Sequence, residues 1–142
     1  MKINMLKELY KIMPKTILII DDDKDFQNAI RTILIKANFN CIQAYSFKQG
    51  LAAVSTSKPD LIILDVMMED ISAGFRFMRQ FRNQEKQEKK ATIPILMVSN
   101  FQNITGIILN DQMKTHLRLV DKFIEKPIEP EVLLKNINKL IN

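Results

Sequence analysis

Short apolar blocks alternate along this chain with longer segments in which apolar residues recur at helical spacing. The blocks predict strands at 17–20, 41–45, 61–64, 93–98 and 123–124. Uninterrupted apolar blocks are typical of strands that are buried on both faces of a parallel sheet. Apolar residues three or four positions apart predict helices at 26–37 and 47–57, around Phe77 and Phe81, and from Pro130 onward.

Five alternations of strand and helix indicate an α/β fold, in which a parallel sheet carries helices on both faces. Residues 100–120 are the exception, because Ile104 and Ile107 suit a helix or a strand and Gly106 weakens both. We expect a helix followed by a long loop there. In such folds the ligand crevice lies at the carboxyl ends of the strands.

Composition narrows the class of protein. The chain has 142 residues, of which 46% are hydrophobic and 26% charged, so we expect one globular domain rather than a disordered chain. One cysteine, Cys41, and one histidine, His116, exclude a disulfide framework and a cysteine- or histidine-rich zinc site. No apolar run is long enough for a membrane span or a signal peptide, and we expect a cytoplasmic protein.

The positive charge is local. Residues 1–20 contribute +3 and residues 76–90 contribute +4, so removing both segments from the net charge of +5 leaves −2. Arg76, Arg79, Arg82 and Lys86 form one row of the second segment, which is either a solvated face or a contact for an acidic partner. Direct binding of nucleic acid is therefore not expected.

Polar residues follow four of the predicted strands, at the point where each strand ends. They are Asp21, Asp22, Asp65, Ser99 and Lys126. Each of them alone is typical of a helix cap, a turn or a solvated surface. Because the carboxyl ends of parallel strands meet at one edge of the sheet, their joint placement favours a functional site.

The residue types at this edge favour phosphoryl transfer. Clustered carboxylates repel one another, and an all-oxygen group of them suits Mg²⁺, which takes one or two carboxylates together with waters and a phosphate. A hydroxyl and an ammonium group are suited to contact the phosphate. A carboxylate can itself accept the phosphoryl group, and Asp65, which ends the central strand, is the best candidate.

Four ordered segments resemble the signature blocks of response-regulator receiver domains, the CheY-like family. They are Ile-Leu-Ile-Ile-Asp-Asp-Asp at 17–23, Leu-Ile-Ile-Leu-Asp-Val-Met-Met at 61–68, Ile-Pro-Ile-Leu-Met-Val-Ser at 93–99 and Phe-Ile-Glu-Lys-Pro at 123–127. The resemblance implies a flavodoxin-like, doubly wound sheet of five parallel strands in the order 2-1-3-4-5. It covers about residues 15–142, and residues 1–14 form an N-terminal leader.

The resemblance also implies the role of each site residue. Asp65 matches the phosphoacceptor, and Asp21, Asp22 and Asp65 match the acids that hold Mg²⁺ together with the backbone carbonyl of Met67. Ser99 matches the switch hydroxyl, and Lys126 matches the phosphate-binding lysine, followed by Pro127 through a cis peptide. Phe123 matches an aromatic switch residue, although an ordinary core aromatic on a short strand fits its pattern equally well.

Three features depart from the family pattern. Glu69 stands where members usually have proline, and the loop glycine arrives one residue late, at Gly74. The segment from Ser99 to Lys126 is several residues longer than usual. The loop after Asp65 and the output surface are therefore expected to be atypical.

The sequence predicts a stand-alone response regulator that accepts a phosphoryl group from a sensor histidine kinase or a phosphotransfer protein. It then switches the surface near the fourth helix and fifth strand toward an unidentified output protein, as a monomer or a phosphorylation-dependent dimer. The alternative is an interaction module of the same fold that acts without phosphorylation. An aspartyl phosphatase of the haloacid-dehalogenase type is disfavoured, because Met67 stands where its second aspartate is needed.

Two further expectations concern the lifetime of the signal and the leader. Met67 and Phe101, which flank the acceptor and switch positions, are apolar, so we expect at most slow self-dephosphorylation and no other enzymatic activity. Ile3, Leu6, Tyr10 and Met13 form a rough stripe in the leader, with lysines interspersed. The leader is either loosely docked or an amphipathic helix for a partner or a membrane surface.

Overall fold

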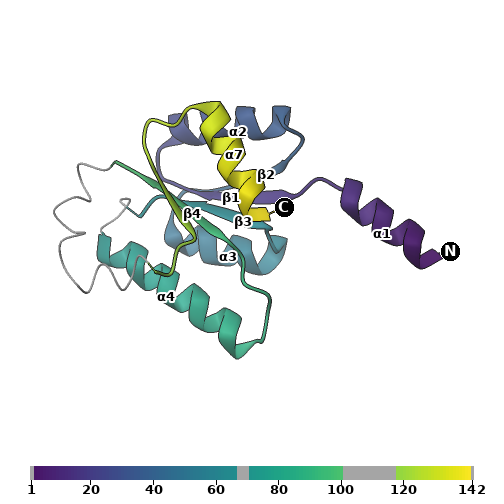
Figure 1. Cartoon of the computed structure of the whole chain (residues 1–142). Coiled ribbons are helices and arrows are strands. Elements are labelled where there is room, and N and C mark those ends of the chain that lie inside the picture. The colour runs from purple at the N-terminus through teal and green to yellow at the C-terminus, as the bar shows by residue number, and fades with distance from the viewer. Residues whose placement is uncertain (1, 67–70, 101–117, 142) are drawn as a thin grey trace.

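Five parallel strands form one sheet in the computed structural model, which describes residues 2–66, 71–100 and 118–141 (Figure 1). The strands are β1 (Thr16–Ile20), β2 (Asn40–Ala44), β3 (Leu61–Leu64), β4 (Ile95–Ser99) and β5 (Lys122–Glu125). Their order in the sheet is β2-β1-β3-β4-β5, which confirms the predicted α/β fold and strand order. The order reverses between β1 and β3, so a crevice is expected at the carboxyl ends of these two strands.

Helices cover both faces of the sheet (Figure 1). On one face lie α2 (Lys24–Lys36) and α7 (Pro130–Ile141), and on the other lie α3 (Phe47–Ser57) and α4 (Ile71–Gln87). Alternate residues of β1 point into two separate cores, Ile17 and Ile19 into one, and Leu18 and Ile20 into the other. Because both faces are buried, the strands need the uninterrupted apolar blocks seen in the sequence.

Local sequence explains where several elements begin. Asp23 caps α2 by accepting a hydrogen bond from the backbone of Phe26, and Ser46 caps α3 by accepting one from Gln49. Pro130 is the first residue of α7, where its missing N–H group costs nothing.

Several strand boundaries differ from the predicted ones by one residue, and the start of β4 differs by two. β4 begins at Ile95, not at Ile93, because Pro94 has no N–H group to donate to the sheet. The N–H group of Ile93 instead donates to Oε2 of Glu85 at 2.6 Å. The helix and loop predicted for 100–120 fall mostly on 101–117, outside the described residues, while 118–120 form a turn.

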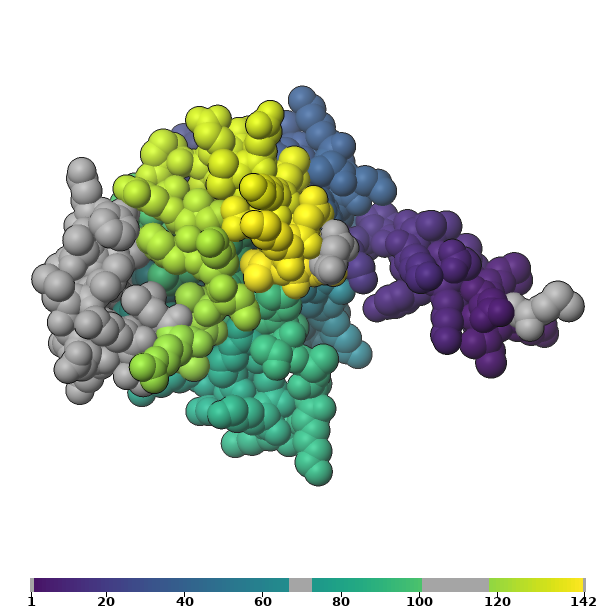
Figure 2. Space-filling view, in the orientation of Figure 1, coloured from purple at the N-terminus to yellow at the C-terminus, as the bar shows by residue number. Residues whose placement is uncertain are grey.

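Residues Lys2–Ile12 form helix α1, which buries none of its side chains. In Figures 1 and 2 it extends away from the sheet and its covering helices, beyond the start of β1. Within the described ranges, no helix is both long and apolar enough to cross a membrane.

Candidate functional site

The carboxyl ends of β1, β3, β4 and β5 bring Asp21, Asp65, Ser99 and Lys126 together. Backbone hydrogen bonds between the strands continue just past their ends: Asp65 N donates to Ile20 O, and Lys126 N donates to Ser99 O, both at 3.0 Å. This continuation places each side chain at the edge of the sheet. The predicted meeting of these residues is therefore seen in the structure.

Asp65 is held by contacts to both of its carboxylate oxygens. The hydroxyl of Ser99 donates to Oδ1 at 2.5 Å, and Nζ of Lys126 donates to Oδ2 at 3.0 Å. Asp65 is 8% exposed and Ser99 is fully buried. The Asp65 carboxylate is thus at the surface of the core, with one neutral and one charged donor beside it.

Lys126 connects the two carboxylates of the site. Its Nζ lies 2.8 Å from Oδ2 of Asp21 and 3.0 Å from Oδ2 of Asp65. The ammonium group also lies 4.0 Å from the centre of the Phe26 ring, within the range of a cation–π interaction. The peptide bond between Lys126 and Pro127 is cis, as the family resemblance implies.

Burial and charge act in opposite directions on the acid–lysine pair. Burial raises the pKa of the Asp21 carboxyl above its ordinary value, although Lys126 and the N–H group of Asp23 act to lower it. Burial acts to lower the pKa of Lys126, but the hydrogen bonds and charges of Asp21 and Asp65 outweigh it and raise that pKa. Lys126 is therefore a firmly protonated cation at the centre of the site.

The acids fit Mg²⁺ as an open site and not as a closed cage. Asp22 is exposed beside buried Asp21, whose Oδ1 accepts a hydrogen bond from Asp23 N at 2.9 Å. Nowhere in 2–66, 71–100 and 118–141 do three histidine, cysteine or acidic side chains gather closely enough to hold a metal. One or two carboxylates with waters and a phosphate are what Mg²⁺ usually takes, so the donor chemistry of Asp21, Asp22 and Asp65 fits this ion.

Of the remaining predicted site residues, one is outside the described part of the chain and the other is on β5. Met67 is outside the described residues, so its carbonyl remains a predicted ligand. Phe123 lies half-buried on β5 and packs against the core that includes Leu18 and Phe77. The strand that carries Phe123 leads directly into Lys126. The switching role of Phe123 stays a prediction.

Gln27 is a buried residue of the site region that the sequence did not single out. Its Nε2 lies within hydrogen-bond distance of three backbone carbonyls: Ile19 at 3.1 Å, Asp21 at 3.1 Å and Ala44 at 2.8 Å. It therefore fixes the ends of β1 and β2 where Asp21 leaves the sheet. A polar residue on the inward stripe of α2, between Phe26 and Ile30, is the signal that could have identified it.

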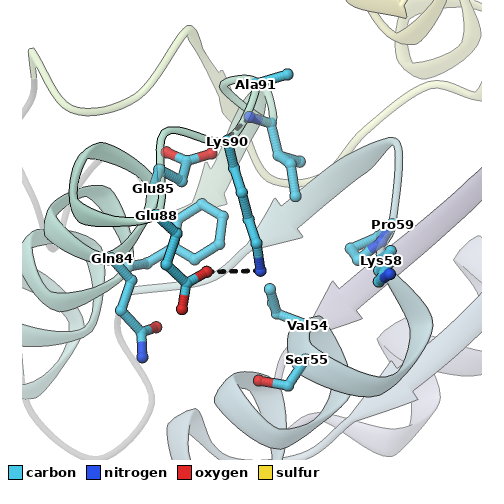
Figure 3. A pocket seen from close by; sticks show the side chains of 11 residues that line it. Val54, Ser55, Lys58, Pro59, Gln84, Glu85, Glu88, Lys90 and Ala91 are labelled. Carbon is cyan, nitrogen blue, oxygen red and sulfur yellow. Dashed lines mark hydrogen bonds and ion pairs between the residues drawn. The ribbon is translucent and has the colours of Figure 1, made fainter.

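The described residues also contain a pocket far from this edge, shown in Figure 3. It has a volume of about 380 Å³ and lies between α3 and α4, near the amino ends of β3 and β4. Its lining includes Val54, Lys58 and Gln84, with an ion pair of 2.6 Å between Lys90 and Glu88. The acids of the candidate site are absent from its lining.

Comparison with known proteins agrees with this geometry. A family model described as the response regulator receiver domain matches residues 17–138. The phosphate regulon transcriptional regulatory protein PhoB of Pseudomonas aeruginosa is 29% identical over an alignment of 131 residues that covers 89% of this chain and 52% of PhoB. Protein PilH of the same organism is 26% identical over 125 residues, which are 88% of this chain and 96% of PilH.

A solved structure shows the same fold. Chemotaxis protein CheY4 of Vibrio cholerae superimposes with a TM-score of 0.72 at 24% identity, covering 89% of this chain and 98% of CheY4. The chain spans about half the length of PhoB and of the Bacillus subtilis regulator PhoP. The match along nearly the whole sheet and the shared fold lead to one conclusion: this chain belongs to the response-regulator receiver domains of two-component signalling.

Proposed function

We propose that this protein is a phosphoacceptor switch in which Asp65 takes a phosphoryl group from a sensor histidine kinase or a phosphotransfer protein. The observation that carries the proposal is the arrangement around Asp65. One carboxylate oxygen accepts from Ser99 and the other from Lys126, at the edge of the sheet where receiver domains are expected to react. Receiver domains are signalling modules and generally not enzymes.

The proposed reaction needs a nucleophile and a means of neutralising charge. An oxygen of Asp65 attacks the phosphorus of a phosphohistidine, the phosphorus–nitrogen bond breaks, and the imidazole nitrogen keeps the electron pair and takes a proton from water. The product is an acyl phosphate on Asp65. Lys126, already a cation within 3.0 Å of that carboxylate, is placed to neutralise the added negative charge.

Asp21, Asp22 and Asp65 would hold Mg²⁺, with the carbonyl of Met67 as a further ligand. When bound, this ion supplies positive charge to the phosphoryl oxygens. Asp21 positions Lys126 in the same region through their 2.8 Å contact, so the lysine is shared between an acid of the metal group and the acceptor.

The proposed switch follows from the contact that phosphorylation removes. The Ser99 hydroxyl now donates to Asp65, and the phosphoryl group adds acceptor oxygens and about one to two negative charges. Ser99 then moves to donate to the phosphoryl group, which favours inward movement of Phe123 and changes the surface near β5 and the helix predicted to follow β4. This shifts a two-state equilibrium toward the form that binds the output partner.

The direct test is phosphorylation of the purified chain with acetyl phosphate and Mg²⁺, followed by intact-mass measurement. We expect the mass of one phosphoryl group, lost in Asp65→Asn and retained in Asp23→Asn, since asparagine caps α2 as well as aspartate does. Labelling of Asp65→Asn would place the acceptor elsewhere. A wild-type chain that is not labelled would favour the interaction module that acts without phosphorylation.

A further inference from the structure

Helix α1 displays a concentration of exposed apolar side chains that is unlike the rest of the described chain. Seven large apolar residues between positions 3 and 13 are between 48% and 72% exposed. They are Ile3, Met5, Leu6, Leu9, Tyr10, Ile12 and Met13. Across the other described segments, only Ile35 and Val132 are large apolar residues of comparable exposure. A group of this kind marks a surface that binds something.

The apolar residues occupy one side of the helix. At about 3.6 residues per turn, Ile3, Leu6 and Tyr10 form one row, and Met5, Leu9 and Ile12 form a second row beside it. The N–H group of Met13 still donates to Leu9 O at 3.1 Å, which continues the helical turn to a seventh apolar residue. Together the two rows cover roughly half of the circumference.

The opposite side of the helix is polar, and two of its four residues are lysines. Asn4, Lys7, Glu8 and Lys11 lie there. Lys11 pairs with Glu8 at 3.3 Å, and both side chains are 71% exposed. Lys2, the first residue of the helix, falls on its apolar side, and Lys15 follows the helix. With these two, the segment has four lysines and one acid, a net charge of +3. Lys15 Nζ also lies 5.1 Å from the centre of the Tyr10 ring.

We infer that α1 binds an anionic lipid surface, lying in the plane of the membrane with its apolar side inserted and its lysines at the lipid phosphates. Charge complementarity and the width of the apolar side favour this occupant. A single partner helix would cover only a narrow stripe of α1 and would leave part of its wide apolar side exposed to water. A second copy would also bring two lysine-rich helices together.

The position of α1 in the fold is compatible with this orientation. The helix precedes β1, whereas Asp21 follows it, so α1 leaves the sheet at the amino edge and the phosphoacceptor site lies at the carboxyl edge. Figure 2 shows α1 clear of the rest of the surface, so membrane contact does not cover the domain that carries Asp65. Binding through α1 is independent of the phosphorylation proposed above.

The test measures co-sedimentation of the whole chain with vesicles of phosphatidylcholine alone and of phosphatidylcholine with phosphatidylglycerol. We expect binding to the anionic vesicles, weakened by salt. Leu6→Gln with Leu9→Gln should weaken it by about tenfold or more, because two apolar side chains no longer insert. The matched control is Ile35→Gln, which changes an exposed apolar residue outside α1 and should bind normally.

A second pair of changes tests the charge. Lys7→Gln with Lys11→Gln should remove most of the preference for anionic vesicles while leaving the apolar side intact. Failure of the wild-type chain to bind anionic vesicles, or equal binding by the Leu6→Gln, Leu9→Gln chain, overturns the inference. Sedimentation of the wild-type chain without vesicles gives a further test. A mass that rises with protein concentration, and does not rise in the Leu6→Gln, Leu9→Gln chain, would also overturn the inference, because a second copy would then cover α1.

Discussion

The Ser99 hydroxyl donates a 2.5 Å hydrogen bond to Asp65 across 34 positions of sequence, joining the ends of β3 and β4. Both partners are buried, so water has little access to this contact. In the unphosphorylated chain the switch donor is therefore already occupied by the acceptor that it is proposed to monitor. In the proposed switch, phosphorylation replaces this bond with another one and so couples the chemistry at Asp65 to the position of β4.

Replacing Ser99 tests that coupling. Ser99→Ala should still accept a phosphoryl group but should lose the response of Phe123, because no hydroxyl can move to the phosphoryl oxygens. We expect a loss of about 1 kcal/mol in the free energy of unfolding from the missing hydrogen bond. NMR shifts of Phe123 on addition of Mg²⁺ and beryllofluoride measure the response. Ser99→Thr, which keeps the hydroxyl, is the control, and an unchanged response in Ser99→Ala would exclude the proposed switch.

Asp22 tests the metal assignment with little risk to the fold. Its side chain is exposed, whereas Asp21 is buried against Lys126. Asp22→Asn should therefore weaken Mg²⁺ binding and slow phosphorylation while thermal unfolding stays nearly unchanged. Titration calorimetry with Mg²⁺ measures the affinity, and Asp25→Asn on α2 is the control. Normal Mg²⁺ affinity in Asp22→Asn would show that the metal ligands have been misassigned.

The lifetime of the acyl phosphate tests a prediction that rests on residue types alone, because Met67 and Phe101 lie outside the described residues. Hydrolysis needs a water placed in line with the phosphorus, and polar side chains beside the site orient such a water. Met67→Asn with Phe101→Glu should therefore shorten the lifetime. The decay of purified phosphoprotein measures it, and an unchanged decay rate would refute the idea that these apolar residues exclude water.

The fold and the meeting of the site residues were predictable because their signals are local. Four apolar blocks are followed by Asp21, Asp65, Ser99 and Lys126. Because the strands are parallel, their carboxyl ends meet at one edge of the sheet and bring these residues together. Arg82 was not predictable in this way. Arg76, Arg79 and Arg82 follow one another at three-residue intervals on α4, so the pattern does not distinguish Arg82 from the other two. The backbone carbonyl that Arg82 contacts belongs to Leu119, 37 positions away, and no nearby residue indicates this contact.

The contacts of Gln27 could not be predicted from the sequence either. Its sequence position on α2 is visible, but the carbonyl groups that it binds belong to β1 and β2. They become neighbours only when the helix packs on the sheet. Side chains that contact the backbone of distant elements leave no periodic pattern, whereas apolar strands and helix caps do.

Cys41 gives a pH-dependent prediction. Burial raises the pKa of its thiol from 9.0 to about 11, partly offset by the charge of Arg31. Alkylation of the folded chain by iodoacetamide should therefore be slow at pH 8 and rise about tenfold per pH unit toward pH 11, since the thiolate is the nucleophile. The urea-unfolded chain should react with a midpoint near 9.0. A folded chain that titrates at this lower midpoint would show that the thiol is not desolvated.

The same shift affects stability. Because the folded state holds the thiol proton more tightly than the unfolded state, the stabilising contribution is complete below pH 9.0 and is lost as pH rises through about 11. Cys41→Ala removes this contribution. The difference in unfolding free energy between the two chains should therefore shrink or reverse over that interval, as measured by urea titration at each pH.

Arg82 supports the prediction with the largest effect on stability. Its Nη1 donates to Glu85 at 2.7 Å and to Ile93 O at 2.7 Å, and its Nη2 contacts Asp121 at 3.1 Å. The side chains of Arg82 and Glu85 are only 12% and 8% exposed. Arg82→Met should cost about 3 kcal/mol, because it leaves the Glu85 carboxylate buried without its cation. Urea unfolding followed by circular dichroism measures the loss.

Arg79→Met is the matched control, since it makes the same change at an exposed position of α4 and should alter stability by about 0.5 kcal/mol or less. Equal losses in the two variants would contradict the role given to Arg82. Adding Glu85→Gln to Arg82→Met should cost less than the sum of the two single changes, because the buried negative charge is then removed together with its cation.

Ile95 N donates to the carboxylate of Asp121, the same group that Arg82 contacts, at 2.8 Å. Hydrogen exchange at Ile95 should therefore also quicken in Arg82→Met, which would place the loosening at the start of β4, the strand that ends in Ser99.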